Sequence, residues 1–181
     1  MDKWDPLILR EVPARAERGF SLFELLVTIS VAAILLAIAV PSYRSIVQRN
    51  SMAAQVNDLV GALNYARSEA VSRGQRVYLC QSTDETHCTD GSNWSDGWIV
   101  YSPDPTAAGV SPASDNIIRV EDGSSGQVQI SRSNGLPAHV SFNADGFALG
   151  SQGDFTFHTN SSVPDRTVEI EPSGVISSSV E

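Results

Sequence analysis

The sequence predicts an α+β protein, in which one long amino-terminal helix packs on a carboxyl-terminal antiparallel β-sheet domain. Three observations carry this prediction. Residues 20–40 form an apolar run with one charged side chain, Glu24. Residues 43–73 then place apolar side chains three and four positions apart, as on one face of a helix. After residue 74 the pattern changes to short runs with a period near two, separated by clusters of Gly, Asn, Asp and Pro.

The apolar run is long enough to cross a membrane. At about 1.5 Å per residue, its 21 residues make a helix of about 30 Å, which is the thickness of a bilayer's hydrocarbon core. A secretory signal peptide is the alternative, but its apolar run has only about 7–15 residues and precedes the cleavage site. Here the small residue Gly19 stands before the run. Arg18 is the basic residue nearest the run, which favours a cytoplasmic amino end.

The residues around Gly19 form a specific signature. Residues 18–28 read Arg-Gly-Phe-Ser-Leu-x-Glu-Leu-Leu-Val-Thr, which resembles the amino-terminal signature of type IV pilins and type II secretion pseudopilins. The resemblance implies that a membrane prepilin peptidase cleaves between Gly19 and Phe20, and that Phe20 then becomes N-methylated. It also places Pro41 at the family's usual helix kink.

The same resemblance divides the chain into four parts. Residues 1–19 are polar and carry four basic and four acidic groups, and they are the expected prepilin leader peptide. Residues 20–41 are the expected transmembrane and assembly helix. Residues 42–74 are the amphipathic second half of that helix, and residues 75–181 are the expected periplasmic, β-rich globular domain.

Glu24 needs an explanation, because a carboxylate in a membrane segment is costly. In a bundle of apolar helices a buried carboxylate requires a partner, and the new ammonium group of a neighbouring Phe20 is available after cleavage. An alternative is local. Ser21 and Glu24 have the spacing of a capping box at a helix start. The two roles are compatible, and the surrounding signature favours assembly.

The helix is expected to run from Phe20 to Arg73, which is 54 residues or about 80 Å, and to end at Gly74. The stripe on its second half is short and rich in Ala, so we expect it to pack on the sheet of the same chain instead of forming a coiled coil. Glu69 and Arg73 are spaced for a weak ion pair, and a contact with a neighbouring subunit is equally compatible. The stripe consists of Ile46, Val47, Met52, Ala53, Val56, Leu59, Val60, Leu63, Ala66 and Ala70.

Two cysteines, Cys80 and Cys88, are the only ones in the chain. An even number beyond a membrane segment predicts a disulfide in an oxidising compartment. A metal site with His87 is the alternative, but two thiols and one imidazole do not complete a tetrahedral zinc site. We therefore expect no metal and a polar loop over residues 81–97 closed by the disulfide.

Eight short runs are expected to be strands, and residues 102–115, rich in Pro, Ser, Ala and Asp, a long loop. Residues 66–77, 79–80 and 94–100 resemble the GspH/FimT group of minor pilins and pseudopilins, whose fold is a long helix packed on a β-rich domain. The strand candidates are Arg76–Cys80, Trp98–Tyr101, Ile117–Val120, Val128–Ser131, Val140–Phe142, Phe155–His158, Thr167–Ile170 and Val175–Ser177.

Nothing in the sequence points to an enzyme or to a cofactor. His87, His139 and His158 are scattered, and neither a G-x-S-x-G elbow nor a phosphate-binding loop is present. The acidic residues near Cys88 lack the spacing of a calcium loop. Trp94 is expected to pack in the core, with an exposed partner contact as the alternative.

The resemblance implies a minor pilin or pseudopilin, a structural subunit of a type IV pilus or a type II protein secretion pseudopilus that acts in assembly priming or at the tip. It would sit in the inner membrane with its globular domain in the periplasm. Its partners would be prepilin peptidase and other major and minor pilins or pseudopilins. Some FimT-like minor pilins bind DNA through basic residues near the carboxyl end, so a DNA-binding minor pilin for natural transformation is the alternative.

The charge of the second half of the chain opposes DNA binding. Residues 77–181 hold three basic residues against 14 acidic ones, a net of −11. Such a surface repels the phosphates of nucleic acids. Val175 and Ser177 also stand where the DNA-binding relatives have basic residues. We therefore expect no nucleic-acid partner.

Overall fold

The computed structural model describes residues 19–103, 116–123, 126–161 and 163–180. The chain falls into two units, residues 1–41 and 42–181. Residues 1–18 of the expected leader lie outside the described residues, as does nearly all of the loop expected at 102–115.

One helix, α1 (Leu22–Arg73), contributes to both units and has 52 residues. It begins two residues later than predicted, because Ser21 is its N-cap: Ser21 Oγ accepts a hydrogen bond of 3.1 Å from the backbone N–H of Glu24. Pro41 lies inside α1, and the helix is assigned without interruption on both sides of it. The kink expected at Pro41 stays a prediction.

Gly74 ends α1, as the sequence predicts. Its φ is +64°, which a residue without Cβ adopts at no steric cost. The N–H of Gln75 donates to the carbonyl of Ala70, and the N–H of Gly74 donates to the carbonyl of Val71. These two bonds form a Schellman motif, which satisfies carbonyls at the end of the helix.

In the first unit, the apolar side chains of α1 are exposed. Examples are Leu22, Ile34 and Ile38, which are 76%, 64% and 70% exposed. The helix is long and apolar enough to cross a membrane by length and composition. The two hydroxyl side chains of α1 within the first unit, Thr28 and Ser30, donate to the backbone carbonyls of Leu25 and Leu26 at 2.8 and 2.7 Å. These bonds remove the cost of placing hydroxyl groups in an apolar environment.

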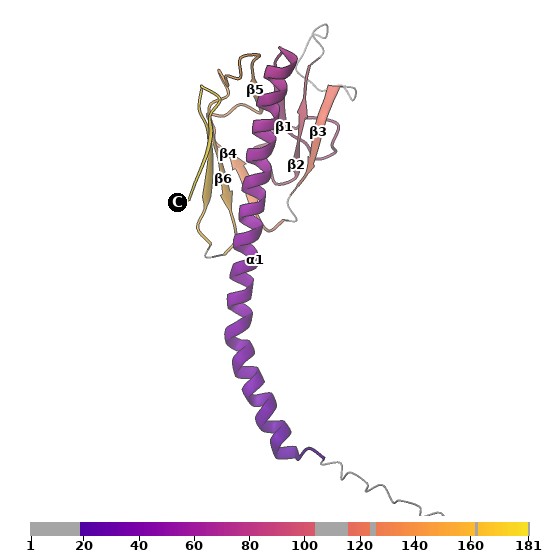
Figure 1. Cartoon of the computed structure of the whole chain (residues 1–181), viewed down its shortest axis with the longest axis vertical. Helices are drawn as coiled ribbons and strands as arrows, with labels where there is room; N and C mark the ends of the chain where they lie inside the picture. The colour runs from indigo at the N-terminus through magenta and orange to yellow at the C-terminus, as the bar shows by residue number, and fades with distance from the viewer. Residues whose placement is uncertain (1–18, 104–115, 124–125, 162, 181) are drawn as a thin grey trace, which may run out of the picture. The chain divides into compact units, whose positions relative to one another are not determined.

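In the second unit, the described residues form two antiparallel four-stranded sheets (Figure 1). All eight predicted runs become strands, and the predicted antiparallel pairing is confirmed. The division into two sheets, with orders β3-β2-β1-β5 and β4-β6-β7-β8, was not predicted. The strands are β1 (Val77–Gln81), β2 (Gly97–Tyr101), β3 (Ile117–Asp122), β4 (Gln129–Arg132), β5 (His139–Phe142), β6 (Gly153–His158), β7 (Arg166–Ile170) and β8 (Ile176–Val180).

One core joins the second half of α1 to both sheets, and Figure 1 shows this part of the helix running along them. From Met52 onward the stripe is buried or, at Ala53 and Val60, partly buried, so the prediction that it packs on the sheets of its own chain is confirmed for that part. It is wrong for Ile46 and Val47, which remain 54% and 38% exposed. The buried helix residues are Met52, Val56, Leu59, Ala62, Leu63, Ala66 and Ala70.

Trp94 is fully buried, although it lies in the polar loop between β1 and β2. Its ring packs edge-on against Phe155 of the second sheet, with 4.8 Å between the ring centroids. The expectation of a core role is confirmed, and a partner contact through an exposed Trp94 is ruled out for this conformation. Trp94 thus packs the loop between β1 and β2 against β6 of the second sheet.

Candidate functional site

The candidate processing site lies just before α1. Gly19 and Phe20 are both exposed, and Phe20 is outside the helix. A Cβ added at Gly19 would meet no heavy atom within 4 Å. Among the described residues neither helix nor sheet encloses the Gly19–Phe20 bond, so the bond is accessible to an enzyme.

Glu24 lies in the first turn of α1, where a carboxylate interacts favourably with the positive end of the helix dipole. Only half of the predicted capping box is present: Ser21 caps the backbone of Glu24. Across the described ranges, no hydrogen-bond or ion-pair partner reaches the Glu24 carboxylate itself. Within the described ranges the carboxylate is therefore free to accept a further partner.

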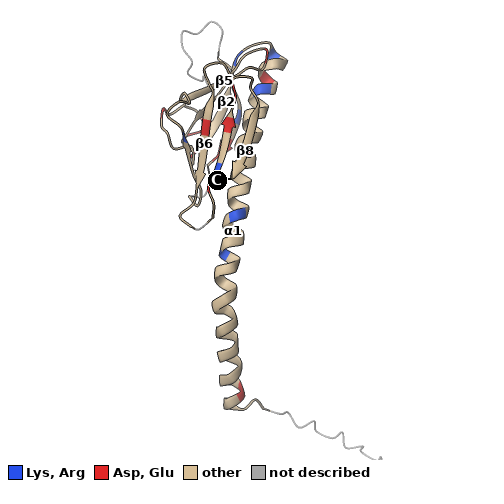
Figure 2. Cartoon of the chain, turned by 90° about the vertical axis from the view of Figure 1, so that its left-hand side faces the viewer, with Lys and Arg blue, Asp and Glu red and all other residues tan. Residues whose placement is uncertain are grey.

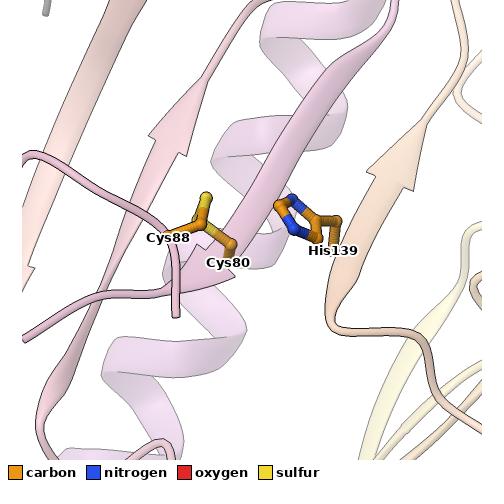
Figure 3. Close-up of side chains that lie close together, drawn as sticks. All are labelled: Cys80, Cys88 and His139. Carbon is orange, nitrogen blue, oxygen red and sulfur yellow. A yellow bond between two sulfur atoms is a disulfide. The ribbon is translucent and has the colours of Figure 1, made fainter. Parts of the chain in front are cut away.

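The disulfide joins Cys80 at the end of β1 to Cys88 in the following loop, with 5.6 Å between the Cα atoms. His139 of β5 lies beside it, because β1 and β5 pair with Cys80 opposite His139 (Figure 3). The three ligand atoms lie within 4.8 Å of one another, the spacing of a metal site. Both sulfurs are in the S–S bond, however, so neither is a thiolate that could bind zinc.

His87 is not the third member of this cluster, contrary to the metal alternative weighed from the sequence. Its Nδ1 instead contacts Asp84 Oδ2 at 2.8 Å. The backbone N–H groups of His87 and Thr86 donate to Asp84 Oδ1 at 2.8 and 3.0 Å. These bonds hold the pKa of the Asp84 carboxyl well below its usual range, so Asp84 stays ionised and orders the loop.

His139 and Tyr101 form a polar contact that sequence reasoning missed. The Tyr101 hydroxyl lies 2.7 Å from His139 Nδ1. Burial raises the pKa of the Tyr101 hydroxyl, so this group is a neutral hydrogen-bond partner at ordinary pH. The signal could not be found in the sequence, because only the pairing of β1 with both β2 and β5 brings these side chains together.

Removing the disulfide is expected to destabilise the globular unit without abolishing its fold. Cys80 and Cys88 are separated by 8 positions, and closing so short a loop stabilises a domain by about 2–3 kcal/mol in the chain-entropy model. The variant with Cys80→Ser and Cys88→Ser, and the reduced wild type, should unfold at the same lower denaturant concentration. Equal stability of oxidised and reduced wild type would contradict this expectation.

Glu69 and Arg73 form the predicted ion pair, with Arg73 Nε 2.6 Å from Glu69 Oε2. The Arg73 side chain is 44% exposed, so the pair contributes at most a few tenths of a kcal/mol. This pair does not decide whether the same helix face also contacts a neighbouring subunit. That contact stays a prediction.

Most basic side chains of the described β-strands already have a partner within the chain. Arg119 pairs with Glu121 and lies over the Tyr65 ring. Arg132 donates to the backbone carbonyls of Leu136, Gly91 and Asp90. Figure 2 shows red acidic segments on the strands, and both red acidic and blue basic segments on α1. A cluster of arginines that could follow a nucleic-acid backbone is absent from the described strands, which agrees with the acidic charge of this half.

Comparisons with known proteins agree with the fold and with the amino-terminal signature. The family described as type II transport protein GspH matches residues 55–174, and the prokaryotic N-terminal methylation motif matches residues 14–40. Two fimbrial proteins of Pseudomonas aeruginosa are each 31% identical over 72 residues, which is 40% of this chain and 46% of the relative. The match thus spans about half the length of these curated relatives.

The solved structures show the same fold. The type IV minor pilin FimU of Pseudomonas aeruginosa, in space group P21, superposes with a TM-score of 0.55 at 21% identity, covering 74% of this chain and 90% of that one. Its P65 crystal form superposes with a TM-score of 0.51, covering 72% and 91%. Since the GspH match covers most of the chain and the methylation motif precedes it, the chain belongs to the GspH family of type II transport proteins.

Proposed function

We propose that this chain is a minor pilin or pseudopilin, a structural, non-enzymatic subunit of a type IV pilus or a type II secretion pseudopilus. One observation carries the proposal: a methylation motif at residues 14–40 leads directly into a 52-residue helix whose second half supports a GspH domain. In this proposal the helix packs with the helices of other subunits, and the β domain is attached to its second half.

The first step is processing at the membrane. Prepilin peptidase cleaves after Gly19, and Phe20 becomes the methylated amino terminus. The exposure of both residues outside α1 supports this assignment. Residues 1–19 are then the leader, and residues 20–41 hold the chain in the inner membrane with residues 75–181 in the periplasm. An oxidising periplasm also suits the Cys80–Cys88 disulfide.

The second step is transfer from lipid into a bundle of helices from other pilins or pseudopilins. The exposed apolar side chains of the first unit suit both environments, since lipid tails and neighbouring helices are equally apolar. Glu24 determines where the helix binds in the bundle. Its unpaired carboxylate meets the ammonium group of a neighbouring subunit's first residue, and Pro41 bends the helix beyond the apolar run.

The proposal is tested by isolating the chain after expression with prepilin peptidase. We expect it in the membrane fraction, with an intact mass that corresponds to a chain starting at Phe20 plus one methyl group. A tagged chain should also capture pilins or pseudopilins of the same host after cross-linking. A full-length, unmethylated chain in the soluble fraction would contradict the proposal.

A further inference from the structure

A hollow of about 370 Å³ in the second unit is lined by the residues of α1 that follow the apolar run in sequence. We call it the basal pocket. Three segments far apart in the sequence line it: one turn of α1, the loop before β4 and the loop after β6. The side chains that line it include Tyr43, Arg44, Val47, Gln48, Gln127 and Asn160.

Among the described residues, four side chains that can donate hydrogen bonds line the basal pocket and have no partner there. Arg44, Gln48, Gln127 and Asn160 provide a guanidinium group and three amides. Within the ranges that the structure describes, none of these four side chains has a hydrogen bond or an ion pair, and no carboxylate lines the pocket. A positive charge surrounded by neutral donors suits a phosphate group and the ester oxygens next to it.

One wall of the basal pocket is apolar and exposed. Tyr43 is 69% exposed, and Val47 is 38% exposed. An aromatic side chain with a polar tip, next to a basic residue with a long apolar stem, is typical of the membrane–water interface. The basal pocket therefore combines polar side chains, of which Arg44, Gln127 and Asn160 are exposed, with apolar surface, which fits a lipid better than a free anion.

The position of Arg44 along the helix agrees with this reading, which rests on the membrane anchoring proposed above. Arg44 follows Val40, the last residue of the apolar run, by four positions, or about 6 Å of helix. The headgroup layer on each side of a bilayer extends about 5–8 Å beyond the hydrocarbon core. Arg49 is nine positions from Val40 and does not line the basal pocket, so it is the comparison for Arg44 on the same helix.

We propose that the basal pocket binds the headgroup phosphate of an anionic phospholipid in the outer leaflet of the membrane that anchors α1. Arg44 pairs with the phosphate, the amides of Gln48, Gln127 and Asn160 bond its oxygens, and Tyr43 and Val47 contact the start of the acyl chains. The bound lipid holds the base of the globular unit at the membrane surface before the subunit is assembled.

The test is to count lipids bound to the full chain in detergent by native mass spectrometry, during titration with phosphatidylglycerol or phosphatidylcholine. The wild type should prefer phosphatidylglycerol. Arg44→Gln should lower its affinity about five- to tenfold, since a charge-assisted contact is lost. Asn160→Ala, in the loop after β6, should weaken binding in the same direction. Arg49→Gln removes the same charge from α1 outside the pocket and should leave the affinity unchanged.

Three results would overturn the proposal. Equal losses in Arg44→Gln and Arg49→Gln would indicate diffuse attraction between charges instead of a pocket. Equal affinity for the two lipids would exclude the preference for an anionic lipid, because phosphatidylcholine carries the same phosphate but no net charge. Displacement of the lipid by millimolar inorganic phosphate would identify a site for the free anion. A chain that is membrane-bound and processed but has no lipid preference contradicts only this inference, whereas an unprocessed, soluble chain contradicts the proposed function itself.

Discussion

Replacing Gly19 with valine is expected to leave the chain at the full length of its precursor. A peptidase that cleaves after Gly19 must hold the backbone closely, and a branched side chain displaces it. A misplacement of about 1 Å at a reacting bond can lower the rate on the order of 100-fold. We therefore expect the mature form to fall about 100-fold, measured by intact mass after pulse labelling in cells that contain prepilin peptidase.

The structure provides the reason to assign this effect to the peptidase. Gly19 is exposed, and an added Cβ would meet nothing within 4 Å, so the substitution does not disturb the fold. Gly61→Val is a matched control, because Gly61 is also exposed and equally free of neighbours, but lies in α1 far from the cleavage site. Normal maturation of the Gly19 variant would remove the cleavage assignment.

Replacing Glu24 with valine is expected to permit cleavage but to prevent incorporation into a filament. The carboxylate would face the ammonium group of a neighbouring subunit in an apolar bundle. Removing one partner of a buried pair costs about 3–5 kcal/mol, because the other charge stays buried without compensation. At about 1.4 kcal/mol per factor of ten, incorporation should fall by two orders of magnitude or more. The amount of the chain in sheared filaments measures this effect.

A second substitution separates assembly from helix capping. Glu24→Gln removes the charge but keeps a side chain that suits this position of a capping box. It should therefore leave α1 intact and still impair incorporation. Thr28→Val is the control within the same apolar run, since the Thr28 hydroxyl bonds only its own helix, at Leu25. Full incorporation of Glu24→Gln would leave Glu24 with a capping role alone.

Much of this protein can be predicted from its sequence, because the relevant signals are local. The apolar run, the helix end at Gly74 and the positions of eight strands depend on residues close together in the chain. The processing signature is also contiguous, so Gly19, Phe20 and Glu24 are recognisable without coordinates. The disulfide required only the count of two cysteines and the expected compartment.

Tertiary structure alone decided which distant segments meet. The separation into two sheets depends on strand partners, such as Cys80 opposite both Ile99 and His139, and no local pattern encodes such a choice. The same is true of the point where burial of α1 begins: Val47 and Met52 are both apolar, but only Met52 is covered by the β domain. The basal pocket likewise exists because two loops approach Arg44. Local periodicity thus determined the elements, and long-range packing determined their neighbours.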